Sequence, residues 1–284
     1  MDSFALRAAN AVAGNRFDAA GLEWALGGGS IRFEQDAVFS LGGARAQATL
    51  AGRAAAPCTT IYASAGEELT IEKIFGGRFV YVAVRGGIEV PLALGSRSTY
   101  LPGKFGGYKG RMLKKDDSLS VGADSSHLPT DGFHYAAELL PRYGPGTVHI
   151  TRGPQADLFD DVAWRALNET EYKVSGASDR TGYRLEGAAL PNRGSTLPSE
   201  ASCPGAIQIP GDGHPIVLMA YAPTVGGYPK IAVVAESDLP IIAQRSPGDP
   251  IRFELITIEQ SQRALKRRAA DLYTISQLAL RSSR

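Results

Sequence analysis

The sequence predicts a mainly β protein with a few helices. Its 33 glycines and 17 prolines in 284 residues are typical of a chain with many turns and short strands. Acidic turn residues precede an alternating strand pattern three times, at 65–71, 115–121 and 247–253, in both halves of the chain. This recurrence predicts two related β-barrel domains.

The first half of the chain begins with helical spacing and then changes to strand spacing. Phe4, Ala8 and Val12 recur at helical intervals until Gly14, so a short opening helix is expected. Short apolar runs bounded by glycine or charged turns then predict strands at 22–26, 37–41, 69–74, 79–84 and 119–121.

Residues 122–135 are polar and rich in turn formers, among them His127 and Asp131. We therefore expect a domain boundary close to them, with an N-terminal β-barrel-like domain at 1–140 and a C-terminal one at 141–284. In the second domain Pro154 suits the first turn of a helix that runs to about Glu169, and a closing helix is expected at 259–280. Strands are expected at 148–151, 172–174, 183–185, 206–209, 216–221, 231–234 and 251–256.

The stretch from Pro204 to Lys230 organises the second domain. Two strand-length apolar runs flank Pro210-Gly-Asp-Gly-His-Pro215, where glycine and proline favour a chain reversal, so a hairpin is predicted. Gln208 is a polar residue in an apolar strand and needs hydrogen-bond partners if it is buried. One interpretation is a structural amide beside a Gly226-Gly227 turn, and the other is a substrate pocket.

Bulk composition excludes several classes of protein. The chain is 44% hydrophobic and 21% charged with a formal net charge of +1, which gives no reason to expect nucleic acid. No apolar run approaches the roughly 18 residues of a membrane span, and no signal segment opens the chain, so we expect a cytoplasmic protein without a membrane partner. Cys58 and Cys203 lie far apart without a CxxC partner, and we expect reduced, buried thiols.

Several familiar catalytic motifs are missing from the sequence. Gly103-Lys104 lacks the spacing of a P-loop, and no GxSxG elbow occurs. The four histidines (His127, His134, His149 and His214) form no HxH or HExxH pair, so no metal site is expected. No Met-Lys-Met context for a biotinyl lysine is present, so the chain is not itself a biotin carrier.

Three glycine-bearing polar clusters remain. The first contains Arg97, the second contains Arg180 and Arg184, and the third is the 208–230 stretch. Arginine beside flexible glycine suits bidentate recognition of a carboxylate, although it equally suits loops that are pinned to backbone carbonyls. The clusters are therefore candidates for binding an acidic small molecule.

With these clusters in view, the chain resembles the family of KipA and the 5-oxoprolinase C subunit, also known as allophanate hydrolase subunit 2 or biotin-dependent carboxyltransferase-like. The resemblance rests on seven motifs: VRGGIEVP at 84–91, LGSRST at 94–99, FGGYKGR at 105–111, GPQADLF at 153–159, SDRTGYRLEG at 178–187, PGAIQIPGDGHPIVLMA at 204–220 and GGYPKIAVV at 226–234. They follow one another in the family's order across almost the whole chain. The family implies a pair of cyclophilin-like β-barrels.

The resemblance also implies an activity. It points to a hydrolase that acts on a cyclic amide, opening 5-oxo-L-proline to L-glutamate with ATP, and that is active only in complex with a KipI-like B subunit and a LamB/YcsF-like A subunit. The family usually has a further strand and a QDxGRxG turn before the MDSFALRAAN segment. It usually reads MADxQTTGGYP, whereas Tyr221, Pro223 and Val225 here replace an acidic residue, a glutamine and a threonine.

Opening an amide requires fixed donors around the developing oxyanion. Gln208, Thr224 and the backbone amides of Gly226 and Gly227 are the candidates, with Asp179 and Glu186 as acid, base or orienting groups. The candidate substrate-binding residues are Arg97, Arg180, Arg184, Gly226, Gly227, Tyr228 and Lys230.

Two other functions stay open at this point. The chain could be a non-catalytic KipA-like protein that binds and antagonises a KipI-like partner. It could also be the carboxyltransferase module of a urea carboxylase or allophanate hydrolase system, which would use biotin carried on another chain.

Overall fold

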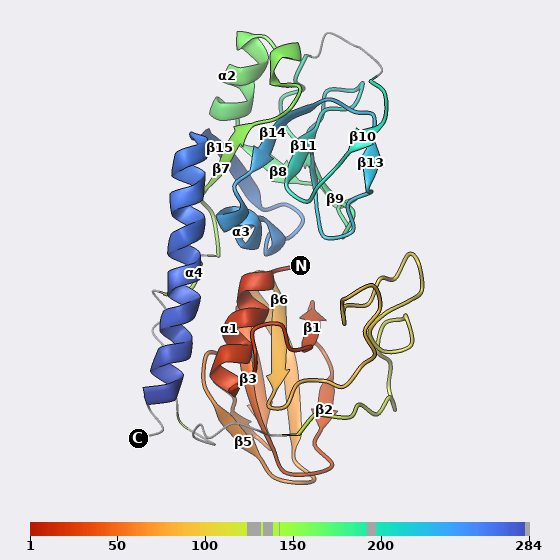
Figure 1. Ribbon diagram of the computed structural model, residues 1–284, viewed down its shortest axis with the longest axis vertical. Helices are drawn as coiled ribbons and strands as arrows, with labels where there is room; N and C mark the ends of the chain where they lie inside the picture. Colours follow the sequence, from red (N-terminus) through yellow and green to blue (C-terminus); the bar gives the residue numbers. More distant parts are fainter. Residues whose placement is uncertain (124–131, 133–138, 142, 192–196, 282–284) are drawn as a thin grey trace. The chain divides into compact units, whose positions relative to one another are not determined.

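The computed structural model describes residues 1–123, 132, 139–141, 143–191 and 197–281. The chain forms two compact units, shown in Figure 1. The barrel unit consists of Met1–Asp2 and Pro141–Ala269, and the sheet unit consists of Ser3–Leu140 and Ala270–Arg284. Strands predominate and helices are few, so the predicted fold class is confirmed.

Among its described residues, the sheet unit holds six antiparallel strands, a short opening helix and the C-terminal part of the closing helix, from Ala270 on. The strands are β1 (Leu22–Ala25), β2 (Ser30–Arg32), β3 (Ala37–Leu50), β4 (Arg53–Ala54), β5 (Ile61–Ala63) and β6 (Glu68–Val84), in the order β1-β6-β3-β4 with β2 on β6 and β5 on β3. Alternate residues of β3 and β6, such as Phe39, Leu41 and Val82, build its core. Apolar residues on one face of a strand bury together in this way.

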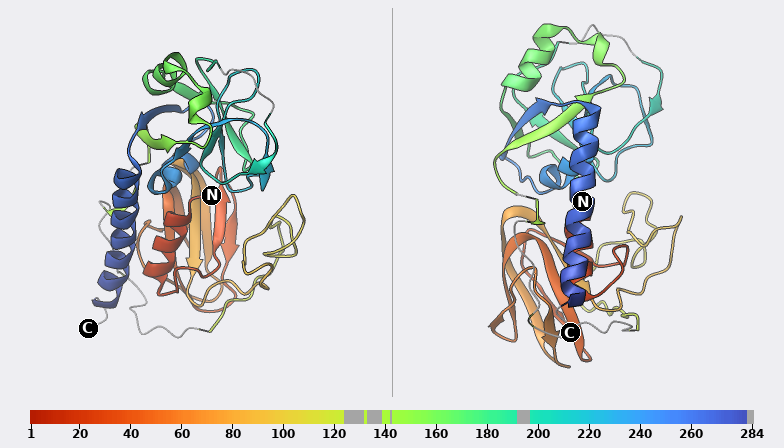
Figure 2. Two further views of the ribbon diagram at one scale, coloured as in Figure 1. Left: turned by 45° about the horizontal axis from the view of Figure 1, so that its top comes forward. Right: turned by 60° about the vertical axis from the view of Figure 1, so that its left-hand side comes forward.

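Helix α1 (Ser3–Ala13) forms where helical spacing predicted it, and it packs on β3 and β6 (Figure 2). Phe4, Ala8 and Val12 are buried, and the helix ends at Ala13, just before Gly14, which has a positive φ of 86°. A β-carbon at Gly42 of β3 would lie 2.7 Å from the Ala5 carbonyl oxygen, so a glycine is required for this close approach.

The prediction of two separate strands at 69–74 and 79–84 was wrong, because β6 is continuous through Gly76 and Gly77. Gly76 takes a φ of 67°, and the pairing of β6 with β3 shifts register here. The glycines therefore make a β-bulge rather than a turn. The expected strand at 119–121 is reduced to an isolated bridge between Ile88 and Val121.

The barrel unit contains a closed ring of seven strands in the order β11-β12-β9-β8-β15-β7-β14. Their bounds are β7 (Thr147–Arg152), β8 (Tyr172–Val174), β9 (Gly182–Glu186), β11 (Ala206–Gln208), β12 (Ile216–Leu218), β14 (Lys230–Val234) and β15 (Pro250–Leu255). A separate two-stranded ribbon joins β10 (Glu200–Ala201) to β13 (Val225–Gly226). Buried Val148, Tyr172 and Ile207 contribute to the barrel core.

The predicted hairpin is confirmed: β11 and β12 pair antiparallel, with Ile207 opposite Val217 and Gln208 opposite Ile216. The turn between them contains Gly213 with a φ of 77°. The second strand ends at Leu218, three residues before the expected end at Tyr221.

The helix expected from Pro154 begins later. Ala156–Leu158 is a short 3₁₀ turn, and α2 (Asp161–Glu169) starts after the N-cap residue Asp160, whose side chain accepts hydrogen bonds from the backbone N–H groups of Val162 and Ala163. An N-cap that satisfies free N–H groups decides where a helix begins more strongly than a proline does.

The remaining helices are α3 (Leu239–Ala243), the 3₁₀ turn Glu236–Asp238, and α4 (Ile258–Arg281), which forms as the closing helix that the sequence predicted. The helices of the described residues include no segment suited by length and hydropathy to crossing a bilayer. Both cysteines are free thiols, but Cys203 is exposed, so the expectation that both are buried was wrong. Cys203 directly precedes the Pro204-Gly205 turn, and Pro204 is likewise exposed.

Candidate functional site

The hairpin places Gln208 in the wall of the barrel. Its neighbours across the sheet are Ile216 on β12 and Lys230 on β14, and a register shift between Ile207 and Gln208 marks a bulge there. The residue is only 5% exposed, and within the described residues its Nε2 has no hydrogen-bond partner. An unsatisfied buried polar group costs about 1–3 kcal/mol and calls for an explanation.

Gly226 lies directly against this amide. A β-carbon at Gly226 would lie 2.8 Å from Gln208 Nε2 and 3.3 Å from Ser202 Oγ. The Ser202 hydroxyl is also buried without a partner among the described residues. Gln208, Ser202 and Gly226 form the Gln208 cluster, in which two buried polar groups without a partner among the described residues lie against a glycine that has no side chain.

A charged network adjoins the Gln208 cluster. Lys230 is 3% exposed, and its Nζ donates to Glu200 Oε1 at 2.6 Å. Gln155 Nε2 donates to the same oxygen at 2.5 Å, while Gln155 Oε1 accepts from the Lys230 backbone N–H. The hydrogen bond from Lys230 lowers the pKa of Glu200, and the one from Gln155 lowers it further. A buried ammonium requires such a partner.

Pairing across strands connects the network to the cluster. Glu200 lies opposite Gly226 in the β10–β13 ribbon, and Lys230 lies opposite Gln208 between β14 and β11. One wall of the barrel unit therefore brings together an amide donor, a hydroxyl and an ion pair between the buried Lys230 ammonium and the partly exposed Glu200 carboxylate. Such groups suit stabilisation of negative charge on an oxygen atom.

Of the residues that the sequence suggested, the structure brings together Gln208, Gly226 and Lys230. Thr224 is exposed, and its carbonyl oxygen accepts from the Ser202 N–H. Gly227 approaches the Leu197 carbonyl oxygen, and Tyr228 is half exposed. The roles suggested for these three residues stay predictions.

Other candidates occupy turns and the outer surface. Asp179 accepts from the backbone N–H groups of Thr181 and Gly182, as a turn-forming Asp does. Glu186 and Arg184 are exposed on β9. The Arg180 guanidinium stacks over the Tyr221 ring, with its Cζ 4.5 Å from the ring centroid. This stack occupies the position where the family resemblance implies an acidic residue.

Gln155, Glu200 and Ser202 were not singled out by sequence reasoning. Gln155 belongs to the GPQADLF motif, which could have drawn attention to it. Glu200 and Ser202 lie outside any motif, and only the β10–β13 pairing brings them to Gly226. Among the histidines, His149 contacts Asp238 through Nδ1 at 2.7 Å and His214 is exposed, while His127 and His134 lie outside the described residues.

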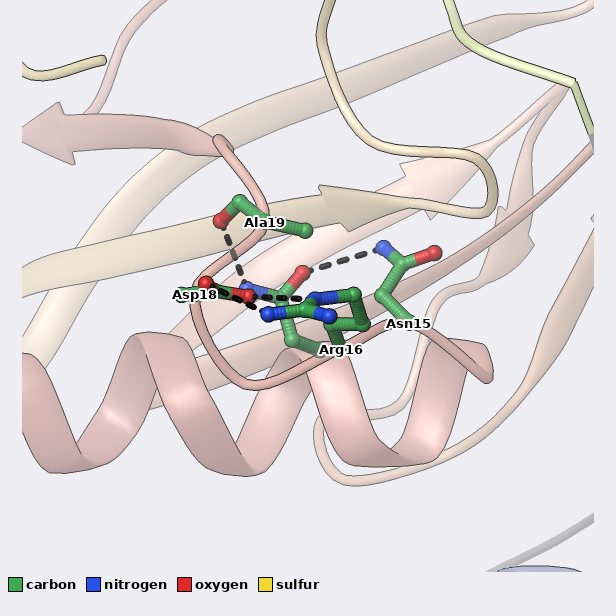
Figure 3. A network of polar contacts seen from close by, with 5 residues as sticks. Asn15, Arg16, Asp18 and Ala19 are labelled. Carbon is green, nitrogen blue, oxygen red and sulfur yellow. Dashed lines mark hydrogen bonds and ion pairs between the residues drawn. The ribbon is translucent and has the colours of Figure 1, made fainter. Parts of the chain in front are cut away.

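Arg97 belongs to the sheet unit, where it lines an open cavity of about 740 Å³. The loop after α1 and the Gly86-Gly87 turn after β6 form the walls of this cavity. Four of its lining residues, Asn15, Arg16, Asp18 and Ala19, are labelled in Figure 3, which shows the polar contacts around them. Arg16 donates to both carboxylate oxygens of Asp18, at 3.0 and 3.1 Å.

Comparison with known proteins relates the chain to characterised relatives. It is 37% identical over 283 residues to the C subunit of 5-oxoprolinase from Escherichia coli, and the match covers 99% of this chain and 88% of the relative. It is 33% identical to the C subunit of 5-oxoprolinase from Haemophilus influenzae, over 96% of this chain and 86% of the relative. The structure of Kluyveromyces lactis urea carboxylase matches with a TM-score of 0.89 at 30% identity, over 97% of this chain and 26% of that chain.

The family match extends over most of the chain. Residues 1–255 match the family described as carboxyltransferase domain, subdomain A and B. The resemblance inferred from the seven motifs is thereby confirmed. The chain belongs to the carboxyltransferase-domain family of subdomains A and B, to which it is joined by sequence similarity along almost its full length.

Proposed function

We propose that the chain is the C subunit of a cytoplasmic, ATP-dependent 5-oxoprolinase that opens 5-oxo-L-proline to L-glutamate. One observation carries the proposal: the 37% identity to the Escherichia coli protein extends over nearly the full length of both chains.

The Gln208 cluster supports the proposal chemically. A ring amide is unreactive until its carbonyl oxygen is stabilised as an oxyanion. Hydrogen-bond donors held in fixed positions in a water-excluded site stabilise such an oxyanion best. In the proposed role Gln208 Nε2 and Ser202 Oγ donate to that oxygen. Lys230 adds positive charge, and Glu200 and Gln155 hold its ammonium in place.

ATP is a substrate of the proposed complex, and partner subunits are the proposed source of its binding site. Gly103-Lys104, the nearest approach to a phosphate-binding pattern, lies in an exposed turn where Lys104 takes a φ of 53°. The proposed partners are a KipI-like protein and a LamB/YcsF-like protein, which would be the other two subunits of the enzyme.

The similarity to urea carboxylase favours a second candidate, a carboxyl-transfer module. In that case biotin carried on another chain would be the substrate, and the same donors would stabilise the oxyanion of its carbonyl group. A KipA-like protein that only binds a KipI-like partner is the non-catalytic alternative.

Reconstitution separates these functions. The purified chain is combined with the candidate KipI-like and LamB/YcsF-like partners, ATP and 5-oxoproline, and glutamate release is measured. Release that requires all three chains supports the proposed function. Stable binding to the KipI-like partner without glutamate release supports the antagonist, and carboxylation of urea with a biotin carrier supports the carboxyl-transfer module.

A further inference from the structure

The cavity in the sheet unit has the size of a small-molecule site. Its volume of about 740 Å³ falls within the roughly 300–1,000 Å³ that such sites occupy. Its lining comes from segments distant in sequence: the loop that follows α1, residues 85–91 at and after the end of β6, Arg97, and Gly122 with Ala123.

Side-chain hydrogen bonds fix the walls of this cavity. Asn10 is fully buried and donates to the Ala19 carbonyl oxygen at 2.8 Å. Asn15 donates to the Val84 carbonyl oxygen at 2.8 Å and accepts from the Gly86 N–H at 2.8 Å. These bonds tie the loop after α1 to the end of β6, so the cavity exists before any ligand binds.

The charges around the cavity do not balance. Three arginines line it, Arg16, Arg85 and Arg97, against the two acidic residues Asp18 and Glu89; Arg85 is buried, and its Nε donates to the Ala13 carbonyl oxygen at 2.7 Å. Asp18 is already paired with Arg16 through two hydrogen bonds. Arg97 is exposed and forms no hydrogen bond or ion pair with the described residues.

Asp18 can neutralise only one of the two arginines near it. The hydrogen bond from Arg16 lowers the pKa of Asp18, and the charge of Arg97 acts in the same direction. The carboxyl group therefore stays ionised at neutral pH while the Arg97 guanidinium remains available. A planar guanidinium fork binds a carboxylate through two parallel hydrogen bonds.

We propose that this cavity binds the carboxylate of a small organic acid, with Arg97 as the group that receives it. Of the three arginines that the sequence suggested for this task, Arg180 is stacked on Tyr221 and Arg184 lies exposed on β9, which leaves Arg97 as the one in a cavity. The inference rests on the proposed function only in taking 5-oxoproline as the acid to test.

Calorimetric titration of the full chain tests the inference. The probes are 5-oxo-L-proline, 2-pyrrolidinone, which has the same ring without the carboxylate, and inorganic phosphate. We expect 5-oxoproline to bind at least about tenfold more tightly than 2-pyrrolidinone, because a charge-assisted hydrogen bond is lost with the carboxylate. Phosphate should not displace it at equal concentration.

Variants of single arginines provide the control. Arg97→Ala should weaken 5-oxoproline binding about tenfold, and Arg97→Lys should recover part of the affinity, because it keeps the charge and loses the fork. Arg32→Ala should leave binding unchanged. Arg32 is an exposed arginine of the same unit, and it forms an ion pair with Glu34, two residues further along the chain, as Arg16 does with Asp18. It does not line the cavity.

Five results would overturn the inference: no binding of 5-oxoproline, equal binding of 2-pyrrolidinone, displacement by equimolar phosphate, full affinity in Arg97→Ala, or normal glutamate release by the reconstituted complex with Arg97→Ala. Glutamate release by the reconstituted complex is scored separately. Normal glutamate release by a complex that contains Arg97→Ala would refute the proposed carboxylate site without contradicting the proposed function.

Discussion

Gln208 is buried, and its Nε2 has no hydrogen-bond partner among the described residues, so its replacement should have opposite effects on stability and activity. Replacement by leucine, Gln208→Leu, fills a similar volume and removes the unpaired amide, so the free energy of unfolding should rise by about 1 kcal/mol. If the amide is an oxyanion donor, turnover in the reconstituted complex should fall about 10²-fold or more. Denaturant unfolding and glutamate release measure the two effects.

Gln244 provides the matched control for this change. It is equally buried in the same unit, but its Nε2 donates to Asp2 Oδ2 at 3.0 Å. Gln244→Leu should therefore destabilise the chain, because it leaves the Asp2 carboxylate without that donor. A Gln208→Leu variant that unfolds as easily as Gln244→Leu would show that the Gln208 amide is satisfied in solution.

Glu200 makes the Lys230 ion pair dependent on pH. Because its pKa is lower in the folded chain than in the unfolded chain, the pair stabilises the fold fully above the unfolded value of about 4.3, and this stabilisation is lost as pH falls through the lower folded value. Glu200→Gln removes the charge. The thermal midpoints of wild type and Glu200→Gln should therefore differ at neutral pH and converge in acid.

Glu186→Gln is the control for this comparison. Its carboxylate is exposed on β9 and makes no hydrogen bond or ion pair with the described residues. Its midpoint should follow that of the wild type at every pH. A constant difference between wild type and Glu200→Gln down to about pH 2 would contradict the ion-pair explanation.

Tyr221 is the clearest departure from the family pattern, and the structure shows what its side chain contacts. The ring holds the Arg180 guanidinium by stacking, and an aspartate at 221 would exchange that contact for an ion pair. We predict that the combined change Tyr221→Asp, Pro223→Gln and Val225→Thr raises 5-oxoproline turnover of the complex. Tyr221→Phe keeps the ring and should change nothing, and a triple variant with wild-type turnover would show that these side chains take no part in the chemistry.

Among the elements, α2 depends on one side chain for its start. The Asp160 side chain accepts hydrogen bonds from two backbone N–H groups. Asp160→Ala should therefore lower the free energy of unfolding by about 1 kcal/mol. Asp161→Ala, one position later in the exposed first turn, removes no such bond and should cost only a few tenths of that. Urea denaturation of both variants is the measurement, and equal losses would refute the capping role.

Sequence patterns predicted the elements well where a regular spacing was present. The apolar interval of α1, the β11–β12 hairpin and the closing helix α4 each followed from local residues. The errors came at glycines and caps: Gly76 makes a bulge inside β6, and Asp160 rather than Pro154 starts α2. Both outcomes depend on which backbone groups find partners, and residue spacing does not specify that.

The candidate site was only partly predictable for the same reason. Gln208 could be found because a polar residue interrupts an apolar strand, and Gly226 because it belongs to a glycine pair. Glu200 lies 30 residues before Lys230 and outside any motif, and only pairing of the two short strands β10 and β13 brings it to the site. Long-range pairing of such short strands leaves no periodic signal in a sequence.

At the scale of the whole molecule, the proposed reaction is divided among chains. We predict that the purified chain alone shows no 5-oxoproline-dependent ATP hydrolysis, because its sequence contains no P-loop. Phosphate release with and without 5-oxoproline is the assay, and the KipI-like and LamB/YcsF-like partners added back serve as the positive control. Substrate-dependent hydrolysis by the chain alone would overturn the assignment of ATP to the partners.

The closed ring of the barrel unit limits how a partner can attach to it. Every barrel strand is hydrogen-bonded on both sides, so the ring offers no free edge to which a partner could add a strand. Strand addition gives affinity through backbone hydrogen bonds and needs such an edge. In the described part of this unit, the open edges belong to the ribbon of β10 and β13, which contains Glu200 and Gly226. A chain that added a strand to this ribbon would thus lay its own side chains beside the Gln208 cluster, and assembly and completion of the site would be a single event.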